Sequence, residues 1–197
     1  MSKIDAEQVV TSLKEGNERY VSLKPINTNY DKQIEHTKDG QHPFAAVLSC
    51  MDSRVPPEII FDQGIGNIFV VREAGNVTSP NTLGSLEYAV NVKKVALVVV
   101  LGHSNCGAVA AAVDGVDLDN FKNLEQLVAQ IKPAIPASKD NVYQCTEKNN
   151  IKLSIAKIFK NSNVIADAVK NNEVKIIGAY YDVATGVVTF DKEYATV

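Results

Sequence analysis

The sequence predicts an α/β fold: a mostly parallel sheet of about five strands, flanked by helices and preceded by an N-terminal helical arm. Two compact apolar runs, residues 44–49 and 95–101, have the length and composition of strands that are buried on both faces. Near the end of the chain, residues 174–182 and 187–190 flank Thr185-Gly186, a pattern typical of a hairpin. The last strand is therefore expected to add an antiparallel edge to a parallel core.

The N-terminal segments precede the first strand. Residues 6–23 carry apolar side chains such as Val9 and Leu13 at three- and four-residue steps, which predicts an amphipathic helix. The apolar stripe of this helix must be covered either by the domain itself or by a second subunit. Residues 24–42 are polar, contain Pro25 and lack periodicity, so we expect a loop or extended arm there.

The middle of the chain alternates helices and strands. The pair Pro56-Pro57 predicts a short helix with proline in its first turn, and Ser79-Pro80 resembles the capped start of a longer one. Small residues after Cys106 are typical of a helix that packs close to a sheet. The remaining elements expected are a strand at 67–71 and helices at 80–92, 106–113, 119–131 and 138–170, the last broken near residues 161–163.

The composition indicates one domain without a nucleic-acid or membrane footprint. The 197 residues are 45% hydrophobic, so a single domain 1–197 is expected, with the helix and arm at 1–42 and the α/β core at 43–197. A net charge of -3 gives no basic surface for nucleic acid, and no segment approaches the ~18 uninterrupted apolar residues of a membrane helix. A charged N-terminus and an odd number of cysteines lead us to expect a cytoplasmic protein without a disulfide framework.

Metal-binding residue types stand where two of the predicted strands end. Cys50 follows the first strand, and His103 and Cys106 follow the strand at 95–101. Ligands bind at the carboxyl ends of strands in open α/β sheets, so these three side chains are expected to meet. Two thiolates and an imidazole suit zinc, and three protein ligands leave a position for water, as in catalytic sites. We therefore expect one Zn²⁺ per chain and interpret Cys145 as a small buried group.

Asp52 and Arg54 stand two and four residues beyond Cys50, on the turn that leaves the same strand. An arginine fork paired with a carboxylate keeps the carboxylate ionised and fixed in orientation. Asp52 can then accept a hydrogen bond from a zinc-bound hydroxide, or bind zinc itself as a fourth ligand and exclude the water. The sequence permits both states.

A Cys-X-Asp-Ser-Arg motif at residues 50–54, combined with a His-X-X-Cys motif at residues 103–106, resembles the signature of the β-class carbonic anhydrases. The resemblance extends from about residue 13 to residue 190. It implies reversible hydration of CO₂ to bicarbonate and a proton by zinc-bound hydroxide. It also implies that the two cysteines and the histidine bind zinc and that Asp52 and Arg54 are catalytic.

The resemblance further implies a substrate pocket shared between subunits. Gln41 stands nine residues before the first ligand, where the plant-type enzymes have a glutamine that donates to substrate. Phe69 and Tyr88 match an aromatic pair that a neighbouring subunit contributes, and Gly107 is assigned to the same pocket. Such a site implies a homodimer or a dimer-of-dimers tetramer.

A second subgroup of the family closes its zinc with the aspartate and binds bicarbonate in a pocket built from Trp, Arg and Tyr. This chain has no Trp, and Val47 stands where that Trp would be, although Arg72 is retained. We therefore expect the plant-type subgroup, with an open zinc that carries water and without bicarbonate regulation of that kind.

Three alternatives stand beside this interpretation. The first is a related hydrolase that uses the same zinc site on CS₂ or COS. The second is a nonenzymatic zinc-stabilised module, in which Asp52 completes a closed site. The third is a zinc deaminase, which is disfavoured because Asn105 stands where its glutamate would be and its Pro-Cys-X-X-Cys motif is missing.

Overall fold

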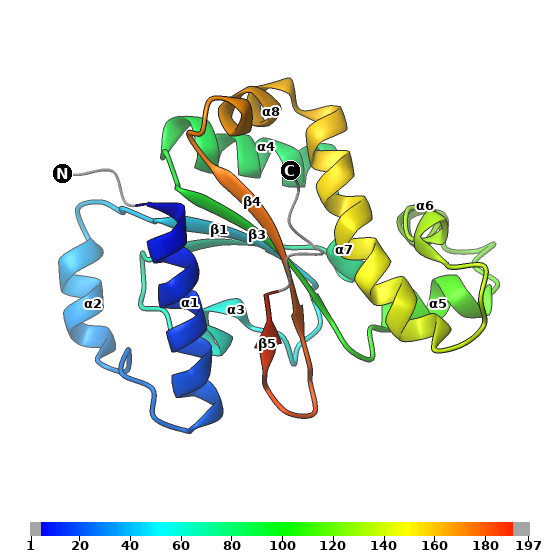
Figure 1. The fold of residues 1–197 in the computed structure, drawn as a ribbon, viewed down its shortest axis with the longest axis horizontal. Helices are drawn as coiled ribbons and strands as arrows, with labels where there is room; N and C mark the ends of the chain where they lie inside the picture. The colour runs from blue at the N-terminus through cyan, green and yellow to red at the C-terminus, as the bar shows by residue number, and fades with distance from the viewer. Residues whose placement is uncertain (1–4, 191–197) are drawn as a thin grey trace.

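One sheet of five strands, in the order β2-β1-β3-β4-β5, organises residues 5–190, the part of the chain that the computed structural model describes (Figure 1). The strands are β1 (Ala45–Ser49), β2 (Ile68–Arg72), β3 (Leu97–His103), β4 (Lys175–Tyr181) and β5 (Val188–Thr189). The first four pair in parallel, and β5 runs antiparallel to β4. The predicted sheet with its antiparallel edge is confirmed, whereas the expected domain limits at residues 1 and 197 lie outside the described residues.

Except for α2, the helices lie where the sequence predicts them. They are α1 (Ala6–Val21), α2 (Tyr30–Thr37), α3 (Pro57–Ile60), α4 (Pro80–Glu87), α5 (Gly107–Asp114), α6 (Lys122–Ala129), α7 (Val142–Asn161) and α8 (Asn163–Lys170). The break between α7 and α8 falls at Ser162, whose side chain caps α8 by accepting a hydrogen bond from the N–H of Ile165 at 3.3 Å. Within the described residues, no helix is both long enough and apolar enough to span a membrane.

Helices cover both faces of the sheet, as Figure 1 shows. On one face the central strands bury Ala46, Leu48, Val98 and Val100 beneath α4, α7 and α8. On the other face they bury Ala45, Val47, Leu97, Val99 and Leu101 beneath α1 and α3. Burial on both faces explains why β1 and β3 are continuous apolar runs rather than alternating ones.

The prediction of an irregular arm over residues 24–42 is wrong in part, because α2 lies within it. Asn29 begins this helix by accepting a hydrogen bond from the N–H of Lys32 at 3.1 Å. No residue of α2 is buried, so the helix has no covered apolar stripe. Its apolar residues are one pair a turn apart, Tyr30 and Ile34, which is too short a pattern to predict a helix from periodicity.

The apolar stripe of α1 is covered by its own domain, one of the two covers that the sequence left open. Val9 and Leu13 are buried in the core on the α1 side of the sheet. Gly16 lies so close to the residues after α3 that a Cβ atom there would be 1.8 Å from the carbonyl oxygen of Phe61. The helix therefore provides no argument for a second subunit.

Asp62 ties the segment after α1 to the core. Its carboxylate accepts hydrogen bonds from Arg19 Nε at 2.6 Å and from the backbone N–H groups of Ile26 at 3.1 Å and Asn27 at 3.2 Å. Burial opposes ionisation of this carboxyl group, but the guanidinium and the two amides outweigh it and lower the pKa of Asp62 below its ordinary value.

We expect Asp62→Asn to lower the free energy of unfolding by about 2 kcal/mol near neutral pH, because hydrogen bonds to a charged group are lost. Since the folded-state pKa is lowered, the carboxylate stabilises the fold above the ordinary aspartate pKa of about 3.9, and this stabilisation is lost as the pH falls through the folded value. Denaturant unfolding of both proteins across this pH range measures the effect. A stability difference that stays constant on acidification would contradict it.

Candidate metal centre

The pairing of β1 with β3 brings the two sequence motifs to one edge of the sheet. Ser49, the last residue of β1, lies opposite Leu101 in the parallel register. Cys50 follows β1 directly, and His103 is the last residue of β3. Both residues therefore lie at the carboxyl edge of the sheet, where open α/β folds bind ligands.

Cys106 reaches the same place because the chain turns back after β3. The N–H of Ser104 donates to the carbonyl of Tyr181 at 2.9 Å, and Asn105 takes a left-handed φ of 56°. Cys106 is then the residue that precedes α5, and the prediction that it lies at the start of this helix is confirmed.

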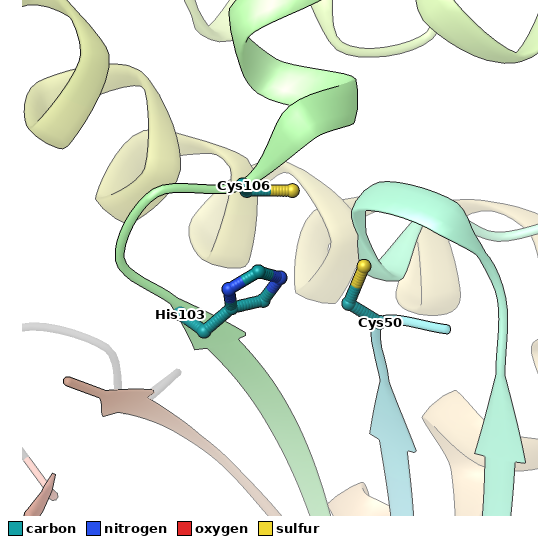
Figure 2. Close-up of side chains that lie close together, drawn as sticks. All are labelled: Cys50, His103 and Cys106. Atoms are coloured by element: carbon teal, nitrogen blue, oxygen red, sulfur yellow. The ribbon is translucent and has the colours of Figure 1, made fainter. Parts of the chain in front are cut away.

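The three side chains form one buried group, and they point toward one another in Figure 2. Their potential ligand atoms, the sulfurs of Cys50 and Cys106 and a ring nitrogen of His103, lie within 4.8 Å of one another. The exposed fractions of these residues are 4%, 4% and 1%. Cys145 is not part of the group.

The imidazole of His103 is oriented by a backbone contact. Its Nδ1 lies 2.9 Å from the carbonyl oxygen of Ser104, and a carbonyl can only accept. Nδ1 therefore carries the proton, and Nε2 presents its lone pair to the group. Nε2 is buried and has no hydrogen-bond partner among residues 5–190, an arrangement that costs free energy unless a cation takes the lone pair.

The pKa values of the two thiols are shifted in opposite directions. The adjacent Cys106 thiol has the largest effect on Cys50; together with the backbone N–H groups of Asp52 and Gly75, it outweighs burial and lowers the pKa of Cys50 to about 4. The two amides lie 3.4 Å and 3.3 Å from the Cys50 sulfur. Contact with Cys50, together with burial, raises the pKa of Cys106.

This donor set fits a zinc ion. Two sulfurs and an imidazole nitrogen are donors that zinc binds readily. The unpaired Nε2 of His103 and the amide-stabilised sulfur of Cys50 are electron-pair donors that converge from two strands (Figure 2). With three protein donors, a fourth position is left for a small ligand such as water.

Asp52 and Arg54 pair as the sequence predicts. Arg54 donates from Nε to Oδ1 at 2.9 Å and from Nη2 to Oδ2 at 2.7 Å, and its own N–H donates to Oδ1 at 2.9 Å. Arg54 is the main cause that lowers the pKa of Asp52 to about 2. Nη2 also donates to the carbonyl of Asn105 at 3.0 Å, which links the two motifs. The Asp52 carboxylate is not part of the Cys–His–Cys group.

The residues that the resemblance assigns to substrate lie in different parts of the fold. Gly107 begins α5 directly after Cys106 and is exposed. Phe69 and Tyr88 contact each other edge to face, with ring centroids 6.1 Å apart. They line an open pocket beside β2 and α4 that contains none of the three group members. Gln41 is exposed in the segment between α2 and β1.

The sequence did not indicate a role for two residues whose contacts with the group involve a backbone N–H. Gly75 donates its N–H to the Cys50 sulfur, and a φ of 65° makes glycine favourable at this position. Glu147 accepts a hydrogen bond from the N–H of Cys106. Gly75 carries a weak local signal, as a glycine in a turn after a strand, whereas Glu147 lies 41 residues from Cys106 and carries none.

Comparisons with known proteins agree with this geometry. The family model described as carbonic anhydrase matches residues 45–188. The chain is 36% identical to carbonic anhydrase 2 of Mycobacterium tuberculosis, with 89% of this chain and 87% of that protein covered. It is 37% identical to the carbonic anhydrase of Mycolicibacterium smegmatis, with 89% and 88% covered.

Solved structures show the same fold. The β-carbonic anhydrase of Coccomyxa, in complex with acetazolamide, superposes with a TM-score of 0.74 at 20% identity, over 94% of this chain and 86% of that chain. A tetrameric β-carbonic anhydrase of Sordaria macrospora superposes with a TM-score of 0.71 at 24% identity, over 94% of this chain and 96% of that chain.

We expect Cys50→Ser to abolish stoichiometric zinc, because a neutral hydroxyl replaces a thiolate donor that two amides stabilise. His103→Ala and Cys106→Ser should have the same effect. Elemental analysis of the purified proteins measures it, with Cys145→Ser as the matched control that retains the metal. Full zinc content in Cys50→Ser would contradict the assignment.

Proposed function

This chain belongs to the β-class carbonic anhydrase family, whose reaction is the zinc-dependent, reversible hydration of CO₂ to bicarbonate and a proton, and we propose that Cys50, His103 and Cys106 hold the zinc ion. The observation that carries the proposal is the buried convergence of these three side chains at the carboxyl edge of the sheet. Among residues 5–190, it is the one group of three or more Cys, His, Asp or Glu side chains whose ligand atoms converge in this way.

A zinc ion bound there supplies a Lewis acid, which lowers the pKa of a coordinated water toward neutrality. The chain's own residues fix the donors. The Ser104 carbonyl holds the His103 proton on Nδ1, so that Nε2 stays free to donate its lone pair. The amides of Asp52 and Gly75 stabilise negative charge on the Cys50 sulfur without adding a competing donor atom.

Asp52 orients the reacting water in this proposal. Its carboxylate is ionised at neutral pH, because Arg54 lowers its pKa to about 2. Oδ1 accepts two hydrogen bonds from Arg54, whereas Oδ2 accepts one and keeps a further lone pair, with which it can accept a hydrogen bond from the water. Arg54 holds the plane of the carboxylate and is therefore a positioning residue.

We place this protein with the open, plant-type sites. The bidentate contact with Arg54 favours the state in which Asp52 stays off the metal over the state in which it becomes a fourth ligand. Val47 is fully buried in β1, where the bicarbonate-regulated subgroup has its Trp. Arg72 donates to the carbonyls of Cys50 at 3.1 Å and Asp52 at 2.5 Å, so its guanidinium is occupied in holding this turn.

A second copy of the chain completes the substrate pocket in this proposal. β2 lies at the edge of the sheet, with β1 as its one strand neighbour among the described residues. An apolar, partly exposed edge strand favours coverage by a partner. Phe69 lies on β2, Tyr88 is 46% exposed beside it, and the pocket that they line contains none of Cys50, His103 and Cys106 of the same chain. We therefore assign the pair, with Gln41, to the site of a neighbouring subunit in a homodimer or dimer of dimers.

Two further aspects follow from the same residues. The two buried thiols must stay reduced to bind zinc, which supports a cytoplasmic location, where disulfides are rare. No observation on the described residues favours CS₂ or COS as substrate, and the relatives compared above are named carbonic anhydrases.

Asp52→Ala and Arg54→Ala are expected to keep one zinc per chain while lowering kcat/KM for CO₂ hydration by about 10- to 100-fold, because they remove an orienting contact and not a ligand. A stopped-flow assay with a pH indicator measures the rate, and elemental analysis of the same samples measures the zinc. Wild-type rates in Asp52→Ala would exclude the orienting role.

Subunit mixing tests whether Tyr88 serves the neighbouring site. We expect Tyr88→Ala to retain zinc with reduced activity, and Cys50→Ser to lack zinc and activity. Coexpressing the two should restore about a quarter of wild-type activity, since random pairing gives half mixed dimers with one complete site each. A mixture no more active than the two variants separately, with mixed dimers verified by differential tags, would contradict the shared site.

A further inference from the structure

Helix α7 buries a polar stripe against the carboxyl edge of the sheet. Glu147, Asn150 and Ser154 recur at three- and four-residue steps and therefore lie on one face of the helix. Their exposed fractions are 5%, 1% and 1%. Polar groups buried to this degree cost free energy unless they have partners, so the contacts they make indicate why this face is not apolar.

Glu147 holds the backbone that carries Cys106. Its Oε1 accepts a hydrogen bond from the N–H of Cys106 at 3.1 Å, and its Oε2 accepts one from the hydroxyl of Tyr180 at 2.6 Å. Cys106 precedes the first residue of α5 and is 4% exposed, so without Glu147 its N–H would be a buried donor that lacks this partner. Tyr180 lies on β4, which connects this carboxylate to the sheet.

Asn150 and Ser154 bind the turn that carries Gly75, the residue whose N–H donates to the Cys50 sulfur. Asn150 Nδ2 donates to the carbonyl of Gly75 at 2.6 Å, and Ser154 Oγ donates to the carbonyl of Asn76 at 2.9 Å. Gly75 and Asn76 both have left-handed backbone, with φ of 65° and 44°. The N–H of Gly75 donates to the Cys50 sulfur at 3.3 Å. One face of α7 thus reaches both sulfur donors through the backbone.

The helix also lies tightly against the strand that carries His103. A Cβ atom at Gly102 would be 2.6 Å from Cγ1 of Ile151, which leaves no room for a larger residue at this crossing. In Figure 1, α7 runs along the sheet beside β3 and β4 towards α5. The helix is therefore fixed relative to all three donor-bearing segments.

We propose that α7 acts as a brace that sets the relative position of the two sulfurs, with Glu147 and Asn150 as positioning residues for the metal. This inference rests on the proposed function, because it takes Cys50, His103 and Cys106 as the zinc ligands. Glu147 fixes the Cys106 side and Asn150 fixes the Cys50 side through Gly75. Loss of either contact loosens one thiolate without removing a ligand.

The test measures metal release and metal geometry on the zinc-loaded full chain. We expect Glu147→Ala and Asn150→Ala to bind one zinc per chain but to release it to a chromogenic chelator about 10- to 100-fold faster than wild type. Glu147→Gln keeps a carbonyl oxygen for the Cys106 amide, so it should restore release to within about threefold of wild type. In cadmium-substituted protein, the ¹¹³Cd resonance and the thiolate charge-transfer band should shift in Glu147→Ala and return in Glu147→Gln.

Ser162→Ala is the matched control. Ser162 is 1% exposed and donates to Glu87 at 2.6 Å, so its loss also removes a buried polar contact near α7, but this contact does not touch the donor group. We expect it to lower the unfolding midpoint while zinc release and the cadmium spectrum stay at wild-type values. If Glu147→Ala does not fold, Glu147→Asp serves in its place, because it keeps the charge but shortens the reach to Cys106.

Two outcomes would overturn the brace. One is zinc release from both Glu147→Ala and Asn150→Ala at the wild-type rate. The other is that Ser162→Ala also releases zinc faster, with release in all three variants following the stability that each has lost. The polar stripe would then have only a general structural role. Failure of the proposed function is distinguishable, since it would appear as wild-type protein without zinc or as Cys50→Ser with full zinc.

Discussion

The parallel pairing of β1 with β3 is the constraint on which the metal group depends. The two strands bury apolar side chains toward both faces of the sheet and cannot separate without exposing them. Cys50 and His103 lie at the ends of these strands, so the hydrophobic core determines how far apart they are. Ordinary core packing thus brings together donors that a flexible loop would hold only at a cost in conformational entropy.

Burial of a sulfur anion requires hydrogen-bond donors that add no metal-binding atom, and backbone amides meet this requirement. They reach the group because the chain adopts left-handed backbone at Gly75 and Asn105, which turns Gly75 N–H toward Cys50 and returns Cys106 toward His103. Such backbone is strained for Asn105, which lacks the freedom of glycine. The Asn105 carbonyl accepts from Arg54, so the strained turn is also held from the neighbouring motif.

The sequence alone predicted the features that are local or that lie at the end of a strand. Cys50, His103 and Cys106 could be brought together because the carboxyl ends of parallel strands meet at one edge, and Asp52 and Arg54 because they share a single turn. Helix α2 was missed because its apolar residues are a single pair one turn apart, Tyr30 and Ile34, which is too short a pattern to predict a helix.

The cover of α1 could not be chosen from sequence, because an apolar stripe does not identify the surface that covers it. Glu147 could not be found either. In the sequence, a glutamate that is buried on a helix cannot be distinguished from one that faces solvent. Its partner Cys106 also lies far away in the chain. Local patterns therefore predict which donor atoms converge, whereas long-range contacts that orient those atoms emerge from tertiary structure.

The exposure of the supporting groups divides the centre into an inner and an outer part. Glu147 and Asn150 are almost fully buried, so water cannot replace their contacts and the sulfur positions are fixed from the inside. The Arg54 side chain is 51% exposed, and an ion pair at such a site contributes little to stability. Its contact with Asp52, which is 16% exposed, is therefore better explained by orientation of the carboxylate. The buried contacts thus hold the Cys–His–Cys group from the inside, whereas the contact between Asp52 and Arg54 lies on the solvent side of it.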